Sequence, residues 1–91
     1  MISDGKKQKG SVLVADDDNH LVKQLSALID RMGYDVVVTG NGENALDLFL
    51  NRQFDAVFTA LKMPGMDGLT LSLQVKASSL NTPVVLILDE H

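Results

Sequence analysis

Four short apolar runs, each rich in β-branched residues, constrain the fold of this chain more than any other feature. They are residues 12–15, 36–39, 56–60 and 84–88, and none alternates between apolar and polar positions. Unbroken apolar runs of this length are typical of strands that are covered on both faces of a parallel sheet. Because parallel strands need crossover connections, we expect helices in the sequence between consecutive runs.

The first two connecting segments have helical patterns. Leucine, isoleucine and methionine recur at helical spacing over residues 21–32, and Asp18 or Asn19 can cap the start of this helix. Gly33 follows its last apolar residue, where helices commonly end. A second helix is predicted over about residues 43–51, after a Gly-Asn-Gly turn.

The third connecting segment gives a mixed signal. Its apolar residues alternate strictly with polar ones from Leu69 to Ala77, which alone is the pattern of a strand. However, Asp67-Gly68 is a suitable helix start, and the crossover between two parallel strands requires a helix. We therefore predict a helix here and an α/β fold with a parallel sheet.

Composition and charge exclude several classes of protein. The 91 residues are 45% hydrophobic, yet no run approaches the roughly 18 apolar residues of a membrane helix. The absence of cysteine excludes a disulfide framework and a thiolate zinc site. The formal net charge is −4 although residues 1–10 hold three lysines, so residues 11–91 are acidic and unsuited to nucleic acid. We expect a cytoplasmic protein with a flexible basic leader, residues 1–10, and one domain, residues 11–91.

Three consecutive aspartates, Asp16, Asp17 and Asp18, directly follow the first strand. The carboxyl ends of the strands are where open α/β sheets bind ligands. Clustered carboxylates repel one another unless a cation is present, and oxygen ligands favour Mg²⁺ or Ca²⁺. The alternative is that Asp18 caps the next helix while the other two lie in solvent, and the residues alone leave both interpretations open.

A second motif, KMPGMDG at residues 62–68, follows the third strand and favours a tight turn before a helix cap. The strings VLVADDDN, DAVFTALKMPGMDG and TPVVLIL together resemble the receiver domain of two-component response regulators, over residues 11–88. The resemblance implies a doubly wound, flavodoxin-like sheet with strand order 2-1-3-4-5. The fifth strand would lie beyond this chain, so we expect the order 2-1-3-4 and an incomplete domain that ends after strand 4.

The resemblance also implies a phosphorylation site. In such domains an aspartate at the end of the third strand accepts a phosphoryl group from a histidine kinase, and an acidic pair binds Mg²⁺. Asp16 and Asp17 match the acidic pair, Asp17 as a direct ligand and Asp16 through water, and the backbone carbonyl of Lys62 matches another ligand. The turn after the acceptor corresponds to Pro64, Gly65, Asp67 and Gly68.

Two positions depart from the family pattern. The acceptor position is occupied by Ala60, and the Thr or Ser position at the end of the fourth strand is occupied by Leu88. An alanine has no oxygen that could attack phosphorus or bind a metal, so we expect no phospho-aspartate at position 60 and weakened Mg²⁺ binding. We also expect the exposed apolar edge of the fourth strand to permit a homodimer.

Three hypotheses follow from these residues. The leading one is a non-enzymatic phosphorelay receiver that acts through contacts with a histidine kinase or another signalling protein. A variant is a native phospho-accepting receiver in which Ala60 was engineered. A hypothesis of another class is a Mg²⁺-dependent phosphatase of the haloacid-dehalogenase type, with Asp16 and Asp18 as its Asp-x-Asp motif, although Asn19-His20 replaces the expected Gly-Thr.

Overall fold

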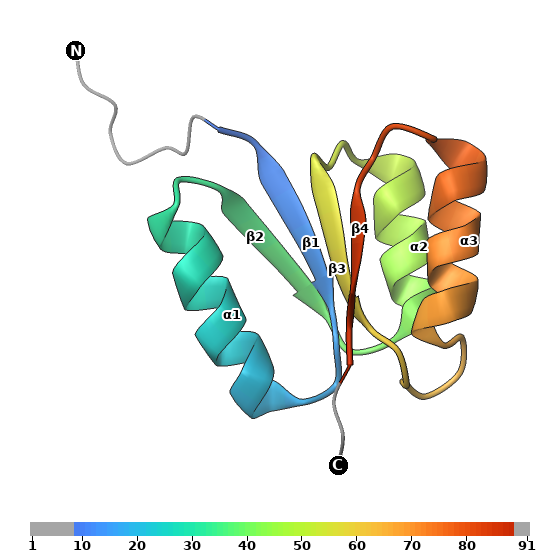
Figure 1. Cartoon of the computed structure of the whole chain (residues 1–91), viewed down its shortest axis with the longest axis horizontal. Coiled ribbons are helices and arrows are strands. Elements are labelled where there is room, and N and C mark those ends of the chain that lie inside the picture. Colours follow the sequence, from blue (N-terminus) through green and yellow to red (C-terminus); the bar gives the residue numbers. More distant parts are fainter. Residues whose placement is uncertain (1–8, 89–91) are drawn as a thin grey trace.

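The computed structural model describes residues 9–88, which form a four-stranded parallel sheet with helices on both faces (Figure 1). Residues 1–8 of the predicted leader and residues 89–91 lie outside the described part. The strand order β2-β1-β3-β4 confirms the predicted α/β sheet. In chain order the elements are β1 (Ser11–Ala15), α1 (Asn19–Arg31), β2 (Asp35–Thr39), α2 (Gly42–Asn51), β3 (Ala56–Ala60), α3 (Gly68–Ser78) and β4 (Val84–Ile87).

Each helix begins at a polar residue that accepts hydrogen bonds from the first turn. Asp18 is the N-cap of α1, Asn41 of α2 and Asp67 of α3. Gly33 follows α1 with a φ of 99°, a left-handed conformation that favours glycine over other residues. The predicted caps at Asp18 and Asp67 and the helix end at Gly33 are therefore confirmed.

Two apolar clusters hold the three layers together. On one face of the sheet α1 packs against β2 and β1, and on the other face α2 and α3 pack side by side against the sheet (Figure 1). The first cluster has Val12, Val14, Val22 and Ile29 as its buried residues. The second has Leu13, Ala15, Ala45, Phe49, Phe54, Val57, Leu71 and Val75. The central strand β1 contributes to both clusters, which makes it the best buried strand of the sheet.

The expectation that all four strands are covered on both faces is wrong for β2 and β4. These strands lie at the two ends of the strand order and have side chains that are half exposed, whereas β1 and β3 are mostly buried. Leu28 and Met32, which belong to the apolar pattern of α1, are also exposed. The reason is that α1 contacts the sheet through Val22 and Ile29, so its outer apolar residues meet no other layer among residues 9–88.

The alternating segment 69–77 is helical, as predicted from its cap and its position between two parallel strands. Leu71 and Val75 are buried against the sheet, whereas Leu69 and Leu73 are exposed. None of the helices within residues 9–88 has the length and apolar character needed to cross a membrane.

Candidate functional site

The carboxyl ends of β1, β3 and β4 meet at one edge of the sheet and enclose a pocket of about 200 Å³. The three aspartates that follow β1 line it, together with the end of β3 and the end of β4. From the last two come Ala60, Leu61, Lys62, Ile87 and Leu88. The structure thus brings together residues of the predicted site that are far apart in the sequence.

Asp16 is buried, with 5% of its surface exposed, whereas its neighbour Asp17 is exposed. The backbone N–H of Asp16 donates to the Thr39 carbonyl at 3.0 Å, which extends the pairing of β1 with β2. Its Oδ1 accepts a hydrogen bond from the backbone N–H of Asp18 at 2.9 Å. The alternative expectation that both residues lie in solvent is therefore wrong for Asp16.

Asp18 acts as the N-cap of α1. Its Oδ1 accepts from the backbone N–H groups of His20 at 3.0 Å and Leu21 at 3.2 Å. These donors have no partner within the helix, so the carboxylate stabilises the first turn and interacts favourably with the helix dipole. The interpretation that Asp18 caps this helix is therefore correct.

Ala60 ends β3 at the floor of the pocket, with 5% of its surface exposed. Its neighbour Thr59 is fully buried and donates its hydroxyl to the Ala60 carbonyl at 3.0 Å, so this hydroxyl already has a partner inside the strand. Leu88, at the Thr or Ser position of the family pattern, lines the same pocket and is largely exposed. Ala60 and Leu88, the two positions that differ from the family pattern, therefore both have apolar side chains at this edge of the sheet.

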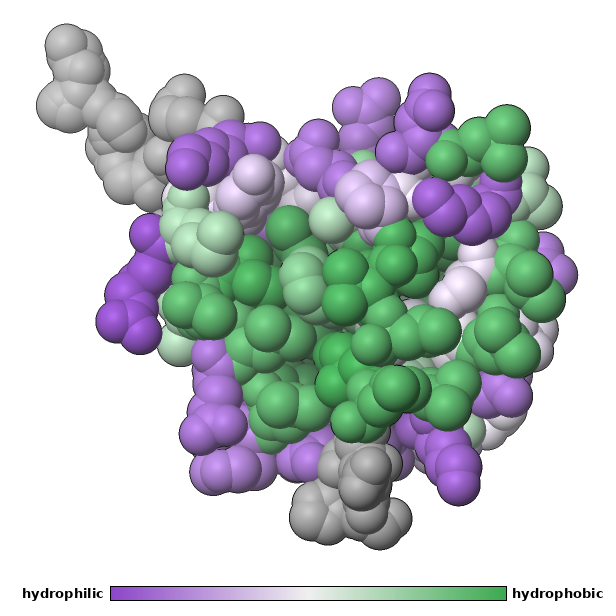
Figure 2. Space-filling view, in the orientation of Figure 1, coloured by the Kyte–Doolittle hydropathy of each residue, from purple (hydrophilic) through white to green (hydrophobic). Residues whose placement is uncertain are grey.

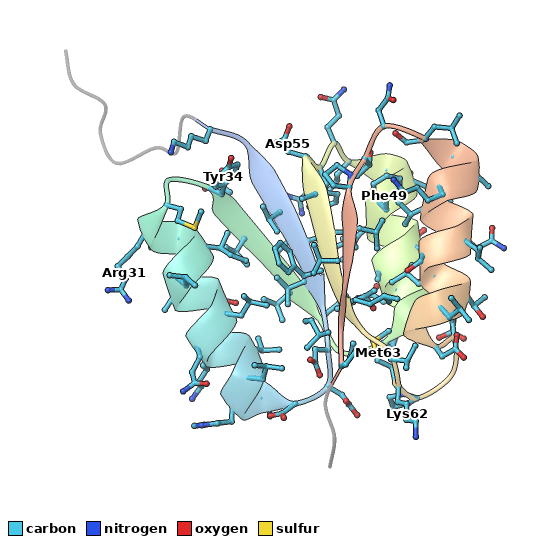
Figure 3. All side chains as sticks on the ribbon, in the orientation of Figure 1. Arg31, Tyr34, Phe49, Asp55, Lys62 and Met63 are labelled. Carbon is cyan, nitrogen blue, oxygen red and sulfur yellow. The ribbon has the colours of Figure 1, made fainter. Side chains whose placement is uncertain are left out.

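The turn after β3 is positioned by close backbone contacts. The N–H of Gly68 donates to the Leu61 carbonyl at 2.8 Å, and a Cβ at position 68 would collide with the Ala60 carbonyl. Gly65 has a φ of 75°, a left-handed conformation that the Pro64-Gly65 turn requires. Lys62 is exposed at the rim of the pocket, next to Met63 (Figure 3).

Glu43, in the first turn of α2, also holds this turn in place, and sequence reasoning did not single it out. Its Oε2 accepts a hydrogen bond from the backbone N–H of Met66 at 3.0 Å. A Cβ at Gly65 would lie 2.5 Å from Glu43 Oε1. No spacing signal predicts this contact, because the two residues are 23 positions apart and belong to different elements.

Asp67 caps α3 through a hydrogen bond from the Thr70 backbone N–H to its Oδ1 at 2.8 Å. Hydrogen bonds from Thr70 stabilise the ionised form and lower the pKa of this carboxyl below its ordinary value of 3.8. Since Asp67 caps a helix and does not line the pocket, its position agrees with a structural role.

The residues at the pocket fit a divalent cation poorly. Within residues 9–88 no three Asp, Glu, His or Cys side chains are arranged to hold a metal ion. Asp18 is engaged as a helix cap, and Ala60 has no side-chain oxygen. Asp16, Asp17 and the carbonyl of Lys62 remain as possible oxygen donors, and Mg²⁺ depends on each of its few protein ligands.

Comparison with known sequences places this pocket in context. The family model for the response regulator receiver domain matches residues 12–90. The sensory transduction protein RegX3 of Mycolicibacterium smegmatis is 34% identical over 77 residues, covering 85% of this chain and 33% of RegX3. The regulatory protein AtoC of Escherichia coli is 30% identical over 76 residues, covering 84% of this chain and 16% of AtoC. The chain thus spans about a third or less of the length of these curated relatives.

Solved structures agree with the sequence matches. The receiver domain of the Francisella response regulator 1452 has a TM-score of 0.79 and 31% identity, covering 86% of this chain and 64% of that one. The response regulator TrrA of Thermotoga maritima, solved with Mg²⁺-BeF, has a TM-score of 0.82 and 26% identity. The match covers 87% of this chain and 69% of that one. A complex of the histidine kinase ThkA with TrrA matches with a TM-score of 0.81 and 26% identity. The match covers 90% of this chain and 72% of the matched chain. These matches confirm the resemblance predicted from the sequence motifs.

Proposed function

This chain belongs to the response regulator receiver domain family of two-component signalling, and from that premise we propose that it is a receiver that takes no phosphoryl group at position 60. The observation that carries the proposal is Ala60 at the end of β3, on the floor of the pocket. Phosphoryl transfer to a side chain requires a nucleophilic oxygen, and a methyl group supplies none.

The neighbouring residues support the same proposal. The hydroxyl of Thr59 is buried and bonded to the Ala60 carbonyl, and Asp67 caps α3, so neither is a good substitute acceptor. Leu88 has no hydroxyl that could bind a phosphoryl group. A single engineered change at position 60 would leave the Thr or Ser of the family in place at position 88, so Leu88 favours natural divergence over engineering.

We also propose that Mg²⁺ binds weakly, through Asp16, Asp17 and the carbonyl of Lys62. Without a carboxylate at position 60 the ion loses one oxygen ligand and one compensating negative charge. The phosphatase alternative needs the carboxylates of both Asp16 and Asp18, and the capping role of Asp18 does not support it. We therefore propose no catalytic activity for this chain.

Because we propose neither phosphorylation at position 60 nor catalysis, we propose that the chain signals through contacts with other proteins. The complex of ThkA with TrrA supports a histidine kinase as one class of partner. The acidic charge of residues 11–91 is unfavourable for nucleic acid, so we propose no such partner for this domain. Binding that does not depend on phosphorylation would rely on the shape and charge of the folded surface.

The test is the intact mass of the chain after incubation with Mg²⁺ and a small acyl phosphate as donor. We expect the wild-type mass to stay unchanged, whereas Ala60→Asp, which restores the acceptor, gains one phosphoryl group. A phosphorylated side chain in the wild-type protein would refute the proposal. In parallel, calorimetric titration should show tighter Mg²⁺ binding to Ala60→Asp, by about tenfold for the added carboxylate.

The protein-contact part is tested with a histidine kinase from the same organism. We expect the affinity of the wild-type chain for the kinase to be unchanged when the acyl phosphate is added. An affinity that changes with the donor in the wild type would contradict this part of the proposal.

A further inference from the structure

We propose that two copies of this chain associate through the outer edges of their β2 strands, so that the two sheets become continuous. Within residues 9–88, β2 pairs with β1 alone and lies at one end of the strand order. It is also an end strand in the order 2-1-3-4-5 that the receiver resemblance implies, so a fifth strand would pair elsewhere. The inference does not depend on the chemistry at Ala60, so it can succeed or fail independently of the proposed function.

The outer edge of β2 offers backbone groups for pairing. The Asp35 N–H donates to the residue before β1 at 2.9 Å, and the Thr39 carbonyl accepts from the residue after β1 at 3.0 Å. Since backbone groups alternate in direction along a strand, Val36 and Val38 direct their N–H and C=O groups away from β1. An edge with such groups can recruit another strand.

A groove of about 600 Å³ lies along this edge, between the helices of the two faces. It is lined by three residues of α1, by the first half of β2 and by the residue that follows α2, namely Ser26, Ala27, Asp30, Asp35, Val36, Val37 and Arg52. Val38, further along the strand, is 44% exposed. The edge is therefore accessible to a second strand.

The side of α1 that borders the groove favours a second copy as the occupant. Lys23, Ser26, Ala27 and Asp30 are spaced at i, i+3, i+4 and i+7, which places them in one row along the helix. Lys23 and Asp30 are exposed and lie at opposite ends of this row. When two such helices meet antiparallel, each Lys23 lies opposite the partner's Asp30. The small side chains of Ser26 and Ala27 let the helices approach closely in the middle.

One two-fold axis suits both the helices and the strands. The row on α1 has its midpoint between Ser26 and Ala27, and β2 has its midpoint at Val37. These three residues line the same groove, so the two midpoints lie at the same level of the sheet. A single axis can therefore relate both elements to their counterparts, and this symmetry closes the assembly at two copies.

The strands are self-complementary about the same axis. If two β2 strands run antiparallel about Val37, Val36 and the partner's Val38 exchange both of their hydrogen bonds. These cross-strand pairs are apolar, which favours the pairing. A charged residue on an edge strand can discourage pairing, but Asp35 lies opposite the partner's Thr39 in this register. No like charges then face each other across the two strands.

The proposed interface differs from the apolar surface on the other side of α1. Figure 2 shows apolar side chains gathered over the face that α1 and β4 present to the viewer. The side of α1 that borders the β2 groove instead carries Ser26, Ala27 and Asp30. Pairing through β2 therefore joins backbone groups and small or charged side chains, and we expect a weak, reversible dimer.

The first test is the association state of the chain by sedimentation, from about 5 to about 500 μM, a range that covers weak dimers. We expect a monomer–dimer equilibrium for the wild type. Asp30→Lys should weaken it by about tenfold or more, because the symmetry turns two facing pairs of opposite charge into two pairs of like charge. The variant should keep its fold, since a cation is favourable in the last turn of a helix.

A charge reversal at both positions gives a sharper test. Lys23→Asp combined with Asp30→Lys again places opposite charges on facing residues, and we expect dimerisation to return to within about threefold of the wild type. Leu73→Lys is the matched control, because Leu73 is 63% exposed on α3, which covers the opposite face of the sheet from α1. This variant should dimerise like the wild type.

A second measurement needs no mutation. In the dimer, the amides of Val36 and Val38 should exchange with solvent several-fold more slowly at high concentration than at low concentration. The Thr70 amide, which donates to Asp67 at the start of α3, should show no such dependence.

Five outcomes would each overturn the proposal. They are a monomer at the highest concentration, an open-ended polymer, wild-type dimerisation by Asp30→Lys, a double variant that stays as weak as Asp30→Lys, and an equal loss of association in Leu73→Lys.

Discussion

The backbone N–H of Met66 lies 3.0 Å from Glu43 Oε2 and donates a hydrogen bond to it, which links the start of α2 to the turn that follows β3. This turn carries Lys62 to the rim of the pocket and leads into the cap of α3. The side chain of Glu43 is exposed, so the bond competes with water and contributes modestly to stability.

Glu43→Ala should lower the free energy of unfolding by about 0.5–1 kcal/mol, since it removes one exposed acceptor for a backbone donor. It should also speed exchange of the Met66 amide, which can be followed by NMR. Glu43→Gln keeps an acceptor oxygen and should therefore lose less stability than Glu43→Ala. Asp47→Ala removes an exposed acid from the same helix and should leave the Met66 amide unchanged; equal effects in both variants would contradict the role of Glu43.

Gly68→Ala should destabilise the fold by about 1–3 kcal/mol, because the new Cβ would press against the Ala60 carbonyl. Helix propensity alone would predict the opposite sign at this first residue of α3. Gly40→Ala is the control, since its Cβ would lie 3.9 Å from the Cα of Asp17 and the backbone there is not left-handed. Urea unfolding midpoints of the two variants check the difference, and similar midpoints would disprove it.

Leu71→Ala should cost about 2–5 kcal/mol, because Leu71 is fully buried in the cluster beneath α3. Leu69→Ala, on the same helix, should change stability by less than about 1 kcal/mol, since Leu69 is 52% exposed. Thermal and urea unfolding of both variants give the comparison. Equal losses of stability in Leu71→Ala and Leu69→Ala would mean that α3 buries a different face from the one described.

Asp67 should make the domain less stable in acid. Hydrogen bonds from Thr70 lower its pKa below 3.8 in the folded state. Its contribution to stability is therefore fully present above the unfolded pKa, taken as the ordinary value of 3.8, and is lost as the pH falls through the lowered folded pKa. Asp67→Asn keeps an oxygen for the cap but does not titrate in this range. Unfolding midpoints measured from about pH 5 to about pH 2 should fall less steeply in the variant; parallel curves would refute this assignment.

The location of the candidate site was largely predictable from the sequence, because its residues lie at or just after the ends of strands. The carboxyl ends of parallel strands lie at one edge of the sheet, so Asp16, Ala60 and Lys62 were expected to come together there, and the pocket contains all three. Glu43 was not predictable, because its contact with Met66 depends on how α2 and the turn pack in space. The helix 69–77 was predicted correctly from its cap and its place between strands, against its own alternating pattern.

The sequence by itself determined the succession of strands and helices and the absence of a nucleophilic oxygen at position 60, because both depend on residue identity and local spacing. Only the tertiary structure decided that Asp16 is buried while Asp17 is exposed, and that Leu28 and Met32, from the apolar pattern of α1, are exposed in the described part of the chain. A periodic pattern indicates which side chains share a face of an element. Whether that face is buried depends on which other elements pack against it, and this is a property of the whole fold.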